Sequence, residues 1–114
     1  MIEVPAERFD QMVRDALAEI PPELARSMDN VVILVEDRPD DDRPLYGLYQ
    51  GVPLTNRGTY AGALPDRITI YQGVISERCR TEQEVAARVR VTVLHEVGHH
   101  FGMSDARLQE LGWA

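Results

Sequence analysis

The sequence predicts one small domain that combines helices with strands. Apolar residues recur at helical spacing in two segments, residues 9–20 and 85–97. Residues 31–35 and 66–71 instead show the composition and alternation of β-strands. A chain of 114 residues with 44% hydrophobic residues has room for one core and is too short for two of useful depth. We therefore expect residues 1–114 to form a single domain.

Charge and hydropathy narrow the possible partners and location. The net charge is −7 and the pI is about 4.8, whereas nucleic-acid-binding domains usually carry a basic face. No apolar run approaches the roughly 18 residues of a transmembrane helix, and the first residues lack the pattern of a signal peptide. We expect a cytoplasmic protein that binds neither nucleic acid nor membranes.

The first third of the chain predicts a helix, a short helical turn and a strand. Pro5 suits a first helical turn, and the apolar stripe that follows predicts a core-facing helix, which Pro21 and Pro22 end. Residues 23–28 are typical of a short helical turn. Residues 31–35 are all apolar and mostly β-branched, which predicts a strand covered on both faces in the centre of a sheet.

The middle of the chain predicts two further strands. Residues 45–54 alternate in a way that permits a strand with glycine bulges, and residues 55–65 are rich in turn residues. Residues 66–71 alternate polar and apolar side chains, the pattern of a half-buried or edge strand. An edge strand can bind an extended peptide by accepting it as an additional strand.

The last third predicts a long buried helix. Thr81 and Glu84 have the spacing of a capping box, and Gly102 is the first residue expected to break the helix. Apolar residues lie on more than one side of this segment, so we expect it in the middle of the domain. Ser104 or Asp105 can begin a final short helix that ends near Leu111.

All three histidines of the protein lie in the stretch HEVGHHFGMSD. His95 and His99 are four residues apart on the predicted helix, so their imidazoles can point at one metal ion. Glu96 follows the first of them and can take a proton from a water held by that metal. This HExxH pattern on a capped, buried helix predicts a zinc site with Glu96 as the general base.

A catalytic zinc usually has three protein ligands and one open position. Gly102 can turn the chain so that Asp105 returns to the metal, which gives the pattern HExxHxxGxxD and makes Asp105 the preferred third ligand. Glu110 on the following helix is the alternative, because a glutamate oxygen is also an acceptable zinc ligand.

The sequence leaves alternatives for the role of His100 and for the residue that would stabilise an oxyanion. His100 is about 100° around the helix from the other two histidines, so we expect a core histidine. The alternative is a residue that supports a metal ligand or contacts the substrate. The candidates for the oxyanion donor are Tyr46, Tyr49, Tyr60, Tyr71, Arg67 and His100.

The stretch HEVGHHFGMSD resembles the metal-binding motif of a small bacterial family of zincin-like metallopeptidases. LYGLYQGVPLTNRG and LPDRITIY are similar to further segments of that family, so the resemblance extends from about Val31 to near the end of the chain. It implies zinc at His95, His99 and Asp105, with Glu96 as the base. It also implies a minimal α+β fold, in which a small mixed sheet packs against an N-terminal helix and a central active-site helix. The motif is metzincin-like, but aspartate replaces the usual third histidine and no Met-turn follows.

These observations favour a zinc-dependent peptidase that acts on peptides or proteins. Two alternatives remain open at this stage: a zinc-containing module that binds peptides without turnover, and a metal-dependent endoribonuclease, against which the acidic pI argues.

Overall fold

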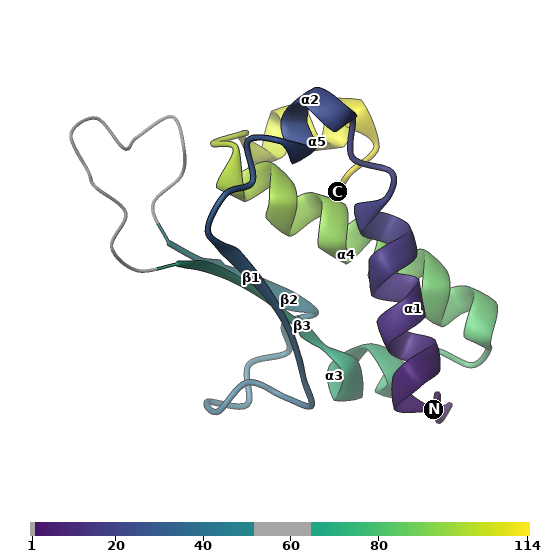
Figure 1. Ribbon diagram of the computed structural model, residues 1–114. Helices are drawn as coiled ribbons and strands as arrows, with labels where there is room; N and C mark the ends of the chain where they lie inside the picture. Colours follow the sequence, from purple (N-terminus) through teal and green to yellow (C-terminus); the bar gives the residue numbers. More distant parts are fainter. Residues whose placement is uncertain (1, 52–64) are drawn as a thin grey trace.

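Three strands form a small mixed sheet in the part of the chain that the computed structural model describes, residues 2–51 and 65–114 (Figure 1). The strands are β1 (Val31–Glu36), β2 (Gly47–Gln50) and β3 (Asp66–Tyr71), in the spatial order β1-β3-β2. β1 pairs with β3 in parallel and β2 pairs with β3 antiparallel. The α+β class with a mixed sheet is therefore confirmed.

Helices cover one face of this sheet (Figure 1). α4 (Glu82–His100) contacts β2 and β3 on one side and α1 (Ala6–Leu17) on the other, so it lies in the middle of the domain. The remaining helices are short: α2 (Pro22–Ala25), α3 (Gln72–Glu77) and α5 (Asp105–Leu111). α3, which directly follows β3, was not predicted from the sequence.

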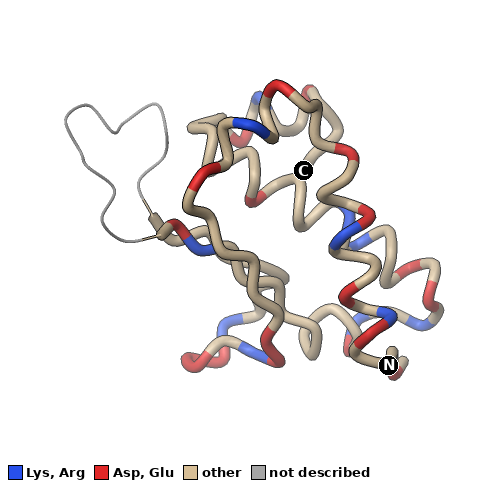
Figure 2. Tube along the Cα trace, viewed as in Figure 1, with Lys and Arg blue, Asp and Glu red and all other residues tan. Residues whose placement is uncertain are grey.

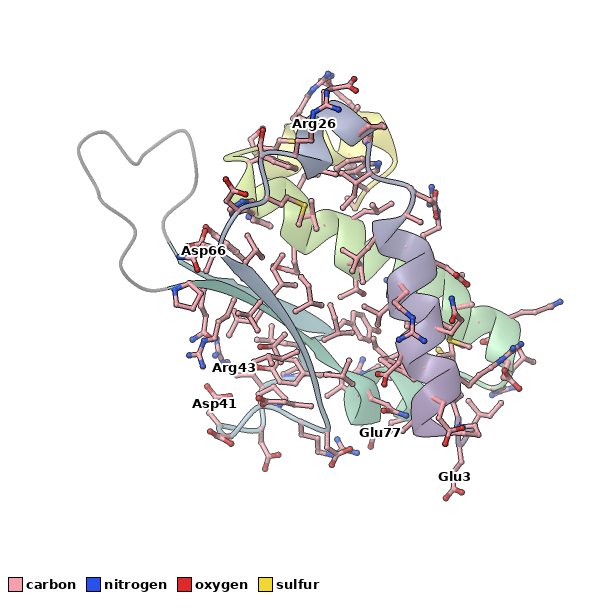
Figure 3. The ribbon with its side chains drawn as sticks, viewed as in Figure 1. Glu3, Arg26, Asp41, Arg43, Asp66 and Glu77 are labelled. Atoms are coloured by element: carbon pink, nitrogen blue, oxygen red, sulfur yellow. The ribbon has the colours of Figure 1, made fainter. Side chains whose placement is uncertain are left out.

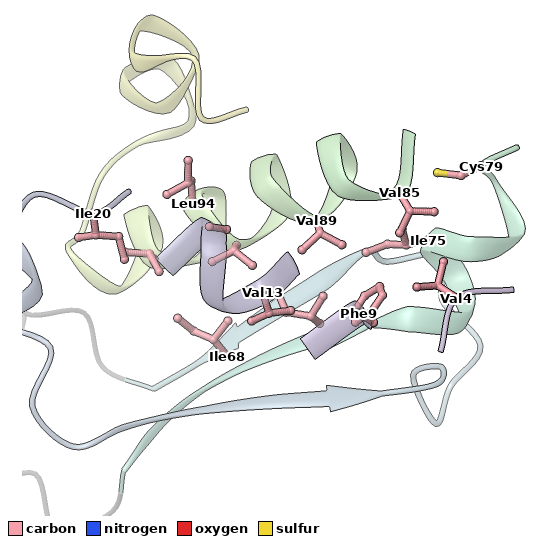
Figure 4. Packing of buried hydrophobic residues seen from close by; sticks show 14 residues of the cluster. Val4, Phe9, Val13, Ile20, Ile68, Ile75, Cys79, Val85, Val89 and Leu94 are labelled. Carbon is pink, nitrogen blue, oxygen red and sulfur yellow. The ribbon is translucent and has the colours of Figure 1, made fainter. Parts of the chain in front are cut away.

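The hydrophobic core lies between α1, α4 and the inner face of β3 (Figure 4). α4 contributes a row of fully buried valines that meets Phe9 of α1 and Ile68 of β3. The valines are Val85, Val89, Val93 and Val97. Burial on two sides explains why α4 carries apolar residues around more of its circumference than an ordinary surface helix.

The predicted side-chain cap by Thr81 at the start of the long helix is present, whereas Glu84 bonds one residue before the N-cap. The Thr81 hydroxyl accepts a hydrogen bond from the backbone N–H of Glu84 at 3.1 Å. The Glu84 side chain reaches back toward the N–H of Arg80 at 3.4 Å. This cap fixes the start of α4 and hence the rotation of the face that carries the histidines.

The predicted positions of two strands in the sheet were wrong. Among the described strands β1 lies at an edge, and Val32 on its outer face is 38% exposed. β3 is the central strand, with Ile68 and Ile70 fully buried. The helices cover only one sheet face, so β1 is apolar without being enclosed. Arg67, Thr69 and Tyr71 of β3 lie on the opposite face. Their alternation with apolar residues does not distinguish an edge strand from a central one.

β2 is shorter than predicted. Its strand begins at Gly47 and ends at Gln50, whereas we expected residues 45–54. Residues 52–54, and all of the predicted turn-rich segment except Pro65, lie outside the described residues.

Acidic and basic residues are interspersed along α1 and along the loop between β1 and β2 (Figure 2). Arg43 and Asp41 form an ion pair in this loop, which lies at the opposite end of the sheet from Asp66 (Figure 3). Within the described residues, no helix is long and apolar enough to span a membrane.

The central position of β3 and the edge position of β1 predict different losses of stability when a side chain of each strand is truncated. Ile68→Ala removes a fully buried side chain of the central strand and should lower the free energy of unfolding by about 2–5 kcal/mol. Val32→Ala, at the exposed edge, should change it by no more than about 1 kcal/mol. Urea denaturation of both variants measures the difference, and equal losses would contradict the central position of β3.

Candidate metal centre

His95 and His99 lie one turn apart at the C-terminal end of α4. Their Nε2 atoms are 3.0 Å from each other, so both rings present the same nitrogen to one point. The two side chains are 28% and 36% exposed, although most of the helix is buried. The pair therefore faces an opening at the surface while its backbone is held by the core.

A glycine turn follows the second histidine. Gly102 has φ of 79°, a left-handed conformation that glycine adopts without steric cost. Its N–H donates to the carbonyl of His99, and the N–H of Met103 donates to that of Gly98, both at 2.9 Å. These two hydrogen bonds form the Schellman motif, which ends α4 and reverses the chain.

The short helix α5 then packs back against the histidine-bearing turn. Leu108 is the one fully buried residue of α5, and its side chain occupies the space beside Gly98. A Cβ atom at Gly98 would overlap Cδ2 of Leu108. The glycine inside the motif is therefore what permits α5 to approach α4 closely.

This approach places Asp105, the first residue of α5, beside both histidines. Its Oδ1 atom lies 3.8 Å from Nε2 of His95 and 3.5 Å from Nε2 of His99. The ligand atoms of His95, His99 and Asp105 all lie within 4.8 Å of one another. Glu110, the alternative third ligand, lies outside this group and pairs with Arg107 at 2.9 Å.

The three ligand atoms fit a tetrahedral zinc ion. Bonds of about 2.0–2.2 Å in that geometry separate two ligand atoms by roughly 3.3–3.6 Å. The observed separations of 3.0, 3.5 and 3.8 Å bracket this range. Two imidazole nitrogens and one carboxylate oxygen are also a donor combination that zinc accepts, with a fourth position open to solvent.

The last residues of the chain orient the first histidine. Nδ1 of His95 lies 3.2 Å from the backbone carbonyl of Trp113. A carbonyl only accepts, so Nδ1 carries the proton and Nε2 keeps its lone pair for a metal. Gly112, with φ of 76°, turns the chain after α5, and the N–H of Trp113 donates to the carbonyl of Leu108 at 2.8 Å.

Glu96 is half-buried at the contact between α4 and β2. Burial raises the pKa of its carboxyl above the ordinary value, His99 and His95 lower it, and the backbone of Tyr49 lowers it by a hydrogen bond. Asp105 contributes a further, smaller rise of this pKa. A desolvated carboxylate with a raised pKa is a stronger proton acceptor than a solvated one.

Comparison with known proteins identifies the family. The sequence profile of zincin-like metallopeptidases matches residues 28–113, which include the histidine stretch and the whole sheet. The chain belongs to the zincin-like metallopeptidase family. No curated protein matches the sequence significantly.

A solved structure shares the fold of this zincin-like domain. It is a conserved hypothetical protein from Thermus thermophilus, with a TM-score of 0.58 and 23% sequence identity. The similarity covers 95% of this chain and 97% of that one. At this identity the likeness supports the arrangement of helices and strands, and nothing about activity.

His100 is a core histidine of the zincin-like domain, as we expected. Its side chain is fully buried, and Nδ1 lies 2.8 Å from Oδ2 of Asp66, at the start of β3 (Figure 3). The same carboxylate oxygen accepts a hydrogen bond of 2.7 Å from the Tyr49 hydroxyl. This buried group connects α4, β2 and β3.

A groove between β2 and α4 leads away from the metal centre. We call it the β2–α4 groove; it has a volume of about 280 Å³, and its lining includes Tyr46, Gly47, Arg88, Thr92, His95 and Glu96. A Cβ atom at Gly47 would lie 2.7 Å from Cγ2 of Thr92 and 3.3 Å from Cγ of Glu96. Glycine at this position therefore lets β2 lie directly against the part of α4 that carries Glu96.

The groove separates the candidates for the oxyanion donor. Tyr46 lines the groove beside His95 and Glu96. The Tyr49 hydroxyl is directed to Asp66, and Arg67 and Tyr71 line a different hollow together with Glu36 and Asp41. Tyr60 lies outside the described residues.

Sequence reasoning missed three residues that shape the centre: Gly98, Leu108 and Trp113. The contact of Gly98 with Leu108 had a signal, since a glycine within a buried helix indicates a close approach by another element. The backbone carbonyl of Trp113 had none, because any residue type carries that acceptor.

The geometry predicts that Asp105, and not Glu110, contributes to metal affinity. Asp105→Ala removes the third ligand atom and should weaken zinc binding by more than the roughly 10–100-fold that is lost with a residue that only hydrogen-bonds to a ligand. Glu110→Ala, the matched loss of a carboxylate on the same helix, should leave affinity within about twofold. Competition titration with a chromogenic zinc chelator measures both, and equal retention of zinc would show that Asp105 is not a ligand.

Gly98→Ala tests the approach of α5. The added methyl group overlaps Leu108, so the variant should lose about 1–3 kcal/mol of stability and bind zinc more weakly. Combining it with Leu108→Ala makes room for the methyl group, so the double variant should lose less than the two single losses added together. Thermal unfolding with and without zinc measures this coupling, and strict additivity would argue against the packing described.

Proposed function

We propose that this chain is a zinc-dependent peptidase that hydrolyses peptide bonds. The observation that supports it is the convergence of three ligand atoms, from His95, His99 and Asp105, at the end of a groove whose wall includes Glu96. Membership of the zincin-like metallopeptidase family supports the same reaction class. We propose peptides or proteins as the substrates, and the cytoplasm as the location.

The metal would be held by two neutral imidazoles and one carboxylate. His95 presents Nε2 because its Nδ1–H donates to the Trp113 carbonyl. When bound, zinc supplies Lewis acidity toward a water molecule and toward the carbonyl oxygen of the substrate. A metal held by these residues would be accessible to solvent, since Asp105 is 82% exposed and the two histidine side chains are partly exposed.

Glu96 would move the proton. Its carboxylate accepts a proton from the attacking water and then passes it to the amine nitrogen of the leaving group. The backbone hydrogen bond from Tyr49 and the contact with Gly47 hold the carboxylate beside the histidines. Its raised pKa makes Glu96 basic enough to accept the proton and acidic enough to return it.

A module that binds peptides without turnover, or an endoribonuclease, would use the same residues differently. The net charge of −7 argues against RNA as substrate. An anionic third ligand would lower the Lewis acidity of the metal relative to three histidines, so we expect slow turnover.

Glu96→Gln tests the proposed reaction. The variant keeps the three ligand atoms, so it should retain zinc while kcat/KM for peptide cleavage falls by about 10²–10⁴-fold. Glu110→Gln is the control, because it removes a carboxylate that lies outside the ligand group. Zinc content by atomic emission and cleavage of an unbiased peptide mixture by mass spectrometry are the measurements.

The outcomes of this experiment separate the alternatives. Peptide cleavage that is unaffected by Glu96→Gln would contradict the proposed role of Glu96 in proton transfer. Zinc retention with no peptide cleavage by the wild type would favour the binding module, and cleavage of RNA in its place would favour the nuclease.

The same variant should not destabilise the metal-free protein. Because the pKa of Glu96 is raised, the folded state disfavours the ionised form, and its stability falls as pH rises through this raised pKa. Glutamine stays neutral, so the variant does not lose stability as pH rises. Urea denaturation of the chelator-treated proteins at pH 7 should therefore give Glu96→Gln an equal or larger free energy of unfolding. A clear loss of stability in the variant would contradict this account of Glu96.

A further inference from the structure

Arg88 lies on the same face of α4 as the metal centre. It precedes Thr92 by four residues and Glu96 by eight, and all three line the β2–α4 groove. Residues at these intervals stack along one side of a helix. A ligand that occupies the groove beside Glu96 therefore extends toward the guanidinium of Arg88.

Arg88 also takes part in a small basic cluster with Tyr46 and Arg78. Its guanidinium carbon lies 4.6 Å from the centre of the Tyr46 ring, and that of Arg78 lies 5.9 Å from the same centre. Tyr46 is itself a wall of the groove. Stacking on an aromatic ring holds a guanidinium in place while leaving its N–H donors available to an anion.

Neither arginine of this cluster has an ion-pair partner among the described residues. Other exposed arginines have an ion-pair partner, such as Arg8 with Glu82 and Arg90 with Glu19. In a chain of net charge −7, this cluster places two positive charges against a single tyrosine ring. They leave the end of the groove positively charged and able to receive a carboxylate.

We propose that the β2–α4 groove selects peptides that present a carboxylate to Arg88, with Arg78 adding to the attraction. This inference rests on the proposed function, because it takes the groove to be the place where a peptide lies. The carboxylate can belong to an aspartate or glutamate side chain, or to the C-terminus of the peptide. Arg88 is thus a specificity residue, remote from the reacting atoms.

The geometry sets the distance between this carboxylate and the scissile bond. Eight helical residues separate Arg88 from Glu96, which corresponds to roughly 12 Å along α4. An extended peptide advances about 3.3 Å per residue. The preferred carboxylate should therefore lie about three or four residues from the bond that is cleaved.

The experiment uses capped octapeptides of alanine and leucine that carry one Glu, moved from position to position, with matched Gln and Lys series. A second pair compares a free C-terminal carboxylate with its amide. Binding is measured by fluorescence anisotropy on zinc-loaded Glu96→Gln protein, and kcat/KM is measured on the wild type. At the preferred position, Glu peptides should exceed Gln peptides by roughly 3- to 10-fold in both measurements.

Variants at Arg88 provide the specific readout. Arg88→Gln should abolish the preference, Arg88→Lys should retain part of it, and Arg88→Glu should favour the Lys series. Arg14→Gln on α1 is the control, since it removes one positive charge from outside the groove. Arg88 is exposed, so these variants should fold and retain zinc as the wild type does.

Three results would overturn the inference: no peptide binds, Glu and Gln peptides behave alike, or the preference survives Arg88→Glu. A preference for the free C-terminus alone would assign the carboxylate to the peptide end. Cleavage without charge preference would leave the proposed peptidase intact and remove this inference. Arg88-dependent binding without any cleavage would support this inference and contradict the proposed peptidase activity.

Discussion

The enclosure of α4 between α1 and the sheet is the constraint on which the rest of the structure depends. The helix must be apolar toward two layers and still present His95 and His99 to solvent at its last turns. Val85, Val89 and Val93 meet the first demand, and the side-chain cap at Thr81 fixes the rotation that meets the second. Because the core holds the helix so firmly, the relative position of the two imidazoles is set before any metal binds.

Close approaches at glycines join the remaining elements to this helix. Gly47 lets β2 lie against Thr92 and Glu96, and Gly98 lets α5 lie against the turn between the histidines. Each glycine therefore determines the position of one functional group: the carboxylate of Glu96 in the first case and that of Asp105 in the second. The groove and the metal centre are two results of the same arrangement, since both form where a neighbouring element meets α4.

Much of this arrangement could be predicted from the sequence, because it depends on local signals. The limits of α4, the turn at Gly102 and the short final helix follow from capping and periodicity, and the meeting of His95 with His99 follows from helical spacing. The order of the strands could not be predicted. The residue patterns of β1 and β3 depend on which sheet face the helices cover, and not on whether a strand is central or at an edge. The Trp113 carbonyl was also beyond prediction, because backbone acceptors leave no mark in a sequence.

The three proposed metal ligands differ in how firmly the protein holds them. His95 and His99 belong to a long helix packed on two sides, whereas Asp105 begins a helix of seven residues whose only fully buried anchor is Leu108. Local opening of such a short element costs much less free energy than unfolding of the core. A bound ion would therefore leave by release of the aspartate first, followed by the histidines. The exchange rate of the metal would then be governed by the opening of α5. Zinc binding would slow amide hydrogen exchange in α5 by a larger factor than in α4.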